Sequence, residues 1–269
     1  MLKRIFDFYI RSSIHVALAV FALVLMTQYM FAIVGGTAMA WFAFFGTIVG
    51  YNFVKYDALA RTGKAQVSLG VKAIAVLSFL SFVGGAYFFF RLSLVTQIVT
   101  VIFLALTILY TLPFFPNRRN ARNWAGVKIY IVALCWTGVT VVLPLLDAGI
   151  GITFEFFVKA LQRFILVFVL ILIFEIIDLA KDDPHLQTVP QQIGVKRTRI
   201  LGFLLLLTFY CLEFLREEFT LVQLGINLAL IAVISLFLLF ANPQRSKYYT
   251  SFWVESIPVL WWLLLLFFS

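Results

Sequence analysis

Residues 157–177 read FVKALQRFILVFVLILIFEII, an almost unbroken apolar run. An α-helix rises about 1.5 Å per residue, so a run of roughly 20 apolar residues is long enough to cross the hydrocarbon core of a bilayer. Lipid offers the backbone no hydrogen-bond partners, so a single run of this kind must be helical to cross it. The stretch therefore predicts a membrane-spanning helix, and it decides the fold class of the chain.

The composition of the whole chain agrees with this stretch. Of its 269 residues, 63% are hydrophobic and 12% are charged, whereas a soluble domain is about 25% charged. A soluble protein this apolar would expose large apolar patches and aggregate. We therefore expect one all-α domain over residues 1–269, a polytopic transmembrane bundle in a lipid bilayer. Cys135 and Cys211 lie inside apolar runs, which favours small core residues over a disulfide or a zinc site.

The apolar pattern predicts about nine spans, of which the third and fourth are divided by Arg91 alone. Their expected ranges are 13–34, 37–54, 69–90, 92–112, 126–146, 157–177, 200–214, 221–240 and 252–268.

If the chain has nine spans, its connections alternate between the two sides of the membrane, and Lys and Arg are unevenly distributed between these sides. Seventeen of the 21 fall on the side of the N-terminus, and the other four are Arg91, Lys159, Arg163 and Arg216. The positive-inside rule then places the N-terminus in the cytoplasm.

The net charge of +9 indicates that the chain lies beside anionic lipid. The sequence lacks the alternation of aromatic and basic residues that is typical of proteins that bind single-stranded nucleic acid. The start, MLKRIFDFYIRSS, reads as the entry to a first span rather than a targeting segment, so we expect a prokaryotic plasma membrane.

The end of the sixth span carries the most unusual polar pattern, EIIDLAKDDPHLQTVPQQIG over residues 175–194. Glu175, Asp178 and Asp182 are spaced by three and four residues. If the helix continues to Pro184, they fall within about 60° of arc on one face. Carboxylates at the C-terminal end of a membrane span are costly, because lipid and the helix dipole both disfavour them.

Two interpretations of these acids remain open. Oxygen ligands suit Mg²⁺, which prefers to share its coordination shell with phosphate oxygens, so the stripe could form a metal–diphosphate site. Alternatively, it is the solvated end of a span whose acids pair with Lys181, Lys196 or Arg197. Glu175 favours the first interpretation, because it precedes Ile176 and Ile177 and faces back into the bundle.

Two further stretches lie on the same predicted side of the membrane. Residues 110–128, YTLPFFPNRRNARNWAGVK, contain Arg118, Arg119 and Lys128. Arg and Lys both suit phosphate, although ordinary loop charge gives the same pattern. Near the end of the second span, Asn52 is expected either in the pocket or in a hydrogen bond between helices, and Asp57 in a loop pair.

Together these residues resemble the UbiA-type intramembrane prenyltransferases over most of the chain, in span count, loop polarity and motif placement. EIIDLAKDDPHLQTVPQQIG is similar to the second acidic motif of that family, and YTLPFFP…RNWAGVK is similar to its fourth-to-fifth helix region. The resemblance implies catalytic roles for Asp178, Asp182 and Asn52. It implies metal-binding roles for Glu175, Asp178, Asp182 and Asp57, and diphosphate contacts from Lys128, Arg119 and Arg118.

The implied activity is transfer of an isoprenyl group from an isoprenyl diphosphate to an aromatic or other lipophilic acceptor. Mg²⁺ and basic residues would neutralise the diphosphate leaving group, and the acceptor would attack the allylic cation.

The chain departs from the family at its first motif. There, Asn is followed by Asp one, four and eight positions later, but Asn52 is followed at those positions by Phe53, Tyr56 and Ala60, and Asp57 is one place out of register. Glu175 also stands where Asp is usual. The alternatives are therefore a non-catalytic relative that binds a prenyl lipid, or an ion-coupled transporter whose acids hold ions.

Overall fold

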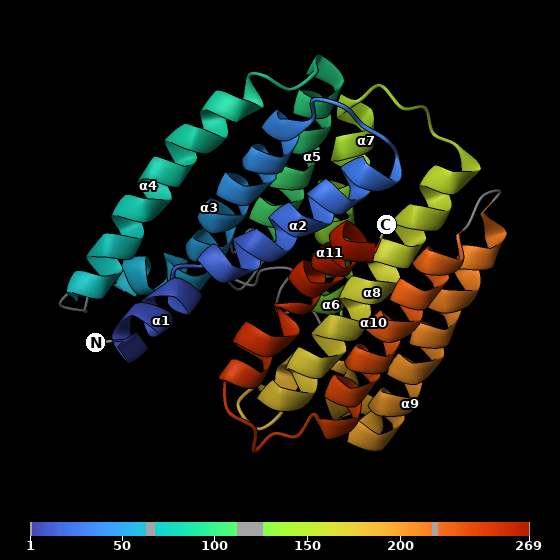
Figure 1. Cartoon of the computed structure of the whole chain (residues 1–269). Helices are drawn as coiled ribbons and strands as arrows, with labels where there is room; N and C mark the ends of the chain where they lie inside the picture. The colour runs from blue at the N-terminus through green and yellow to red at the C-terminus, as the bar shows by residue number, and fades with distance from the viewer. Residues whose placement is uncertain (1, 63–67, 112–125, 217–219, 269) are drawn as a thin grey trace.

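The computed structural model describes residues 2–62, 68–111, 126–216 and 220–268, and every regular element in these ranges is helical (Figure 1). The α-helices are α1 Leu2–Arg11, α2 Ile14–Met30, α3 Thr37–Thr62, α4 Leu69–Phe89, α5 Leu94–Thr111, α6 Lys128–Thr137, α7 Leu143–Asp147, α8 Phe154–Asp178, α9 Val189–Cys211, α10 Leu221–Phe240 and α11 Ile257–Phe268. Shorter turns of helix are η3 Gly138–Val142, η4 Pro184–Leu186, η5 Leu212–Leu215 and η6 Tyr249–Val254. The all-α prediction is confirmed for these residues.

Seven described helical stretches are long and apolar enough to cross a membrane. They are Thr37–Tyr56, Leu69–Phe89, Lys128–Asp147, Phe154–Asp178, Val189–Leu215, Leu221–Phe240 and Tyr249–Phe268. An eighth is present if α1 and α2, which meet at a bend of 57°, count as one span. These helices are compatible with an integral, multi-pass membrane protein.

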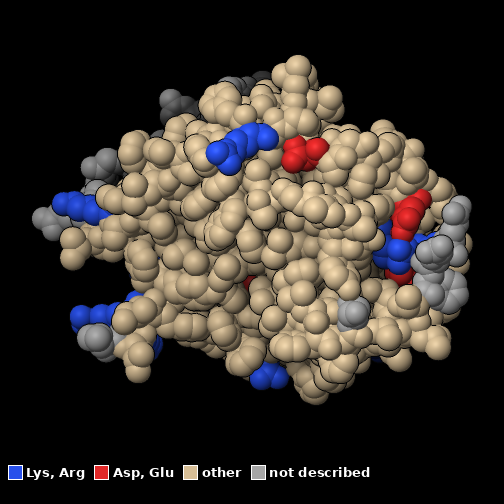
Figure 2. Space-filling view, turned by 45° about the horizontal axis from the view of Figure 1, so that its top comes forward, with Lys and Arg blue, Asp and Glu red and all other residues tan. Residues whose placement is uncertain are grey.

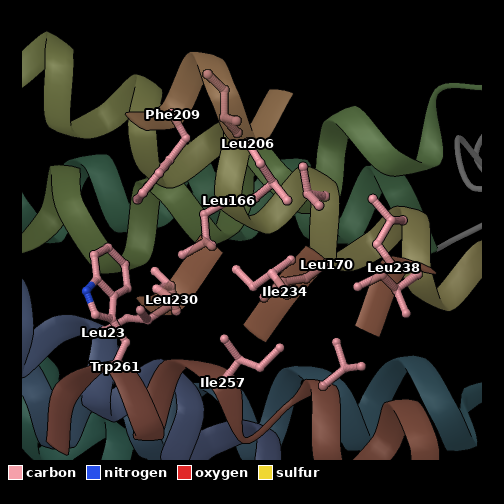
Figure 3. Close-up of a cluster of buried hydrophobic side chains, with 14 of the residues drawn as sticks. Leu23, Leu166, Leu170, Leu206, Phe209, Leu230, Ile234, Leu238, Ile257 and Trp261 are labelled. Carbon is pink, nitrogen blue, oxygen red and sulfur yellow. The ribbon is translucent and has the colours of Figure 1, made fainter. Parts of the chain in front are cut away.

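Helix α8 lies at the centre of the bundle. In its most apolar window 72% of the residues are buried, against 17–50% in the other six spans. A helix that is apolar on all sides is expected to be surrounded by others. Figure 3 shows Leu166 and Leu170 of α8 among apolar side chains of the neighbouring helices. The labelled neighbours are Leu23, Leu206, Phe209, Leu230, Ile234, Leu238, Ile257 and Trp261.

The outward faces of the peripheral helices are apolar. Helix α4 runs along one edge of the bundle beside α3, with exposed Phe79, Leu80 and Phe82. In Figure 2 the charged side chains form small separate groups on a mostly uncharged surface. Such a surface is stable against lipid and unstable against water.

The predicted span boundaries agree with the helices in most places. The division at Arg91 is confirmed, because α4 ends at Phe89 and α5 begins at Leu94. The N-terminal segment is more than an entry to the first span. It forms α1, and the chain then turns at Ser13, whose φ is 64°.

Residues far apart in sequence meet at the two ends of the bundle. One end, the α1 end, carries α1, residues 126–128, the connection 178–188 and residues 242–248. The opposite end carries residues 31–36, 90–93 and 148–153 and Arg216. The predicted acidic stripe and the predicted basic residue Lys128 both lie at the α1 end.

Candidate functional site at the end of α8

Helix α8 ends at Asp178, six residues before Pro184. The prediction that Asp182 continues the helical stripe is therefore wrong. Two amides that would continue the helix, those of Lys181 and Asp182, both donate to the Asp178 carbonyl, at 2.7 and 2.9 Å. This shared acceptor closes a tight turn, so Asp182 stays within one turn of the helix end without belonging to it. The Asp183 carboxylate then caps η4 by accepting from the His185 amide.

Glu175 is buried and anchors the next helix. Its Oε2 accepts a hydrogen bond of 3.0 Å from the amide of Val189, the first residue of α9. The first amides of a helix have no partner within the helix, and its N-terminus carries partial positive charge. The Glu175 carboxylate therefore accepts a hydrogen bond from an otherwise unpaired amide and places negative charge next to the positive end of the helix dipole. Sequence spacing did not reveal this role, because it depends on how residues 179–188 fold back.

Asp178 and Asp182 are less fully engaged. The Asp178 carboxylate lies 3.8 Å from Lys181, and both side chains are largely exposed, so this pair contributes little to stability. The Oδ2 atom of Asp182 is buried without a hydrogen-bond partner. Buried polar atoms without partners are uncommon in folded proteins. The Asp182 carboxylate therefore marks a place in this connection where a polar ligand would gain contacts.

Lys128 is held beside this connection. It is the first residue of α6, and the preceding Gly126 donates its amide to the Leu186 carbonyl at 3.1 Å. Lys128 lies close enough to Glu175 and Asp178 to interact electrostatically with both. This placement agrees with the prediction that Lys128 and the acidic residues lie on the same side of the bundle. A cation and three carboxylates thus converge where α6, α8 and α9 meet.

The carboxylates do not form a closed metal cage. Among the described residues, no three His, Cys, Asp or Glu side chains lie close enough together to hold one ion. The donor set does fit Mg²⁺ bound in its usual way, through one or two carboxylates, several waters and the oxygens of a phosphorylated substrate. Arg118, Arg119 and the side chain of Asp57 lie outside the described residues.

Asn52 is occupied by bonds within the bundle. Its amide nitrogen donates to the Ser12 carbonyl at 3.0 Å and to Ser78 Oγ at 2.9 Å, and its oxygen accepts from Ser13 Oγ at 2.8 Å. Of the two roles open to Asn52, the structure shows the hydrogen bond between helices. This side chain holds the turn between α1 and α2 against α3 and α4.

A second polar cluster, at the opposite end, was not anticipated. Glu213 is fully buried and accepts hydrogen bonds from Lys159, Gln162, Asn227 and Arg216. Arg216 also pairs with Glu155. Burial disfavours the Arg216 charge, but its bonds to these two carboxylates outweigh that cost and raise its pKa. The sequence signal was Lys159 and Arg163, one helical turn apart inside an apolar run.

No protein-family model, no curated protein and no solved structure matches this chain. Its function therefore has to be argued from its own residues.

Proposed function

We propose that this chain is a membrane-embedded, prenyltransferase-like protein that acts on an isoprenyl diphosphate at the α1 end of α8. The observation that carries the proposal is that Lys128 lies close to the acidic residues at the end of α8, in a connection that leaves Asp182 Oδ2 without a hydrogen-bond partner. The resemblance of residues 175–194 to an acidic prenyltransferase motif supports it.

The proposal includes a topology. Adding α5 to the seven long helices and to the α1–α2 pair gives nine crossings, with the α1 end in the cytoplasm and the chain in a prokaryotic plasma membrane. The excess of Lys and Arg on that side supports this orientation.

Each residue of the site has a distinct task in this proposal. Lys128 and, from the neighbouring loop, Arg118 and Arg119 bind the diphosphate. Asp178 and Asp182, with Glu175 behind them, would hold Mg²⁺, which neutralises the charge of the leaving diphosphate when bound. Asp57 stands as a further metal ligand. Asn52 supports the site by holding α3 in place. The apolar helices exclude water and hold the prenyl chain and its lipophilic acceptor.

The test is consumption of a labelled isoprenyl diphosphate by the purified full-length protein, with and without Mg²⁺ and with candidate acceptors. We expect Asp178→Asn to abolish Mg²⁺-dependent consumption, because a metal ligand and a charge are lost. Asp183→Asn is the matched control: Asp183 lies in the same connection, and Asn can still cap η4 through its side-chain oxygen.

A second candidate is a non-catalytic relative that binds a prenyl lipid. The bonds that already occupy Asn52 and Glu175 favour it, because those oxygens are less free to take part in chemistry. Binding of the diphosphate that needs Lys128 but forms no product with any acceptor would support this candidate. An absence of binding would contradict both.

A further inference from the structure

A cleft lies where the end of α10 meets α9, two helices that pack side by side (Figure 1). Its volume is about 380 Å³, within the range of about 300–1,000 Å³ that is typical of ligand clefts. Two apolar and four polar side chains line it, and two of the polar ones are arginines. The lining residues are Arg199 of α9, Leu239 and Phe240 of α10, and Asn242, Gln244 and Arg245 beyond α10.

This cleft lies where two apolar runs of the chain end. One run begins at Ile200, directly after Arg199, and the other ends at Phe240, two residues before Asn242. Leu239 and Phe240 are about half exposed, with 48% and 53% of their surface accessible. Apolar surface faces hydrocarbon, and charged side chains lie at or beyond the headgroups. In a membrane, the cleft would therefore lie at the depth of the lipid headgroups, whichever side the α1 end faces.

Both arginines bind the end of α10 through only part of their guanidinium groups. Arg199 Nη2 donates to the Ala241 carbonyl at 2.6 Å, and Arg245 Nε donates to the Phe240 carbonyl at 3.2 Å. The last carbonyls of a helix lack partners within it, which explains why cations lie here. A guanidinium has five N–H donors, however, and neither arginine has another hydrogen bond to a described residue. Most of their donors are therefore left for a ligand.

No described carboxylate pairs with either arginine, because the ion pairs of the described residues all involve other cations. The acids outside the described residues are Glu217, Glu218 and the side chain of Asp57. The first two precede Leu221, the start of α10, whereas the cleft is at the other end of this helix, about 30 Å away. Asp57 belongs to α3, which packs mainly against α2 and α4. The ligand that suits two unpaired guanidinium groups is an anion with oxygen acceptors, such as a phosphate.

We propose that this cleft binds the phosphate of an anionic membrane phospholipid between Arg199 and Arg245, with an acyl chain against Leu239 and Phe240. Basic pockets between membrane helices bind anionic headgroups in this way. The two apolar residues favour a lipid over free phosphate, because only a lipid has an apolar chain to bury against them. A lipid with net negative charge is favoured over a zwitterionic one, whose ammonium group would lie near two cations. This site is separate from the acidic site at the end of α8 and does not depend on prenyl transfer.

The experiment titrates the purified full-length protein in detergent and counts bound molecules by native mass spectrometry. The three ligands are phosphatidylglycerol, phosphatidylcholine with the same acyl chains, and inorganic phosphate. We expect phosphatidylglycerol to bind about tenfold more tightly than phosphatidylcholine, and inorganic phosphate to bind more weakly than both. Replacing both Arg199→Gln and Arg245→Gln should raise the apparent Kd for phosphatidylglycerol about tenfold or more, which corresponds to about 1.4 kcal/mol.

The matched control combines Lys196→Gln with Arg197→Gln. It removes two exposed positive charges from the same part of α9, outside the cleft, and should leave the Kd unchanged. If the double cleft variant does not fold, Arg245→Gln alone changes an exposed side chain and should still raise the Kd about threefold, against Arg197→Gln as its control. An equal loss of affinity in cleft and control variants would overturn the proposal, because overall charge would then attract the lipid. Equal binding of the two lipids, or binding of inorganic phosphate as tight as that of phosphatidylglycerol, would overturn it as well.

Discussion

At the scale of single residues, Glu175 shows how one side chain can serve both structure and a ligand site. It anchors α9 through the Val189 amide and faces Lys128 across the α6–α8 contact. A carboxylate that already accepts a hydrogen bond from a helix N-terminus has fewer lone pairs left with which to bind a metal. This makes Asp178 and Asp182 the main candidates for ligands and Glu175 the support behind them.

The two roles of Glu175 can be separated by substitution. Glu175→Gln keeps an oxygen acceptor for Val189, whereas Glu175→Leu leaves that amide unpaired. An unpaired buried amide costs about 1–3 kcal/mol, so we expect the Leu variant to lose about that much unfolding free energy. The Gln variant should lose less than half as much. Reversible unfolding in detergent measures both, and equal losses would show that charge, not the hydrogen bond to α9, is what Glu175 contributes.

Gly138 is the residue where close packing is most easily tested. It begins the π-helical turn η3, and a Cβ atom at this position would overlap the Phe103 ring of α5. Gly138→Ala should therefore destabilise the protein by about 1–3 kcal/mol through overpacking. Adding Phe103→Leu should recover most of that loss. Gly46→Ala, which meets no atom within 4 Å, is the control, and a loss there of similar size would contradict the packing argument.

At the scale of elements, the pairing of α3 with the α1–α2 turn depends on Asn52. Its three hydrogen bonds join Ser12, Ser13 and Ser78. Hydrogen bonds between membrane helices contribute about 0.6 kcal/mol each on average, so Asn52→Ala should lower stability by about 1–2 kcal/mol. The test measures both the unfolding free energy of the variant and its affinity for an isoprenyl diphosphate. Lost binding with unchanged stability would instead show that Asn52 contacts the ligand directly.

The elements also show where sequence reasoning worked and where it could not. Long apolar runs predict helices well, because lipid excludes other backbone structures from a single span. The end of α8 was misplaced because Pro184 was taken as the only stop. In fact the amides of Lys181 and Asp182 share the Asp178 carbonyl and close the helix earlier. Such a turn depends on tertiary fit and leaves no clear trace in residue spacing.

At the scale of the whole molecule, the proposed orientation can be measured directly. In a variant without Cys135 and Cys211, single cysteines replace Ser246 at the α1 end or Ser93 at the opposite end, both exposed. In intact cells a membrane-impermeant thiol reagent should label Ser93→Cys and spare Ser246→Cys until the membrane is opened. The reverse pattern would place the α1 end outside and would remove the cytoplasmic site from the proposal.

Contacts between distant spans were beyond sequence reasoning. Lys159 and Glu213 lie 54 residues apart and come together only when α8 and η5 meet. In a hydropathy analysis each of them is a charged residue that makes its own span less favourable in lipid. A single sequence does not show which of these charged residues pair with one another. Lys128 and the acids at the end of α8 were easier to associate, because the alternation of sides placed them at one end.

Helix α1 forms hydrogen bonds with the residues that lead into η6 and α11. Asp7 of α1 accepts hydrogen bonds from Tyr248 at 2.6 Å and Lys247 at 3.1 Å, and next to α1, His15 of α2 bonds to the Phe252 carbonyl at 2.9 Å. A ribosome adding roughly 5–20 residues per second needs about 12–48 s to make the intervening chain. During that time α1, an amphipathic helix that carries Lys3, Arg4, Asp7 and Arg11, lacks these partners, and we expect it to lie at the lipid headgroups. The docking of α1 therefore has to follow the synthesis of residues 247 and 248.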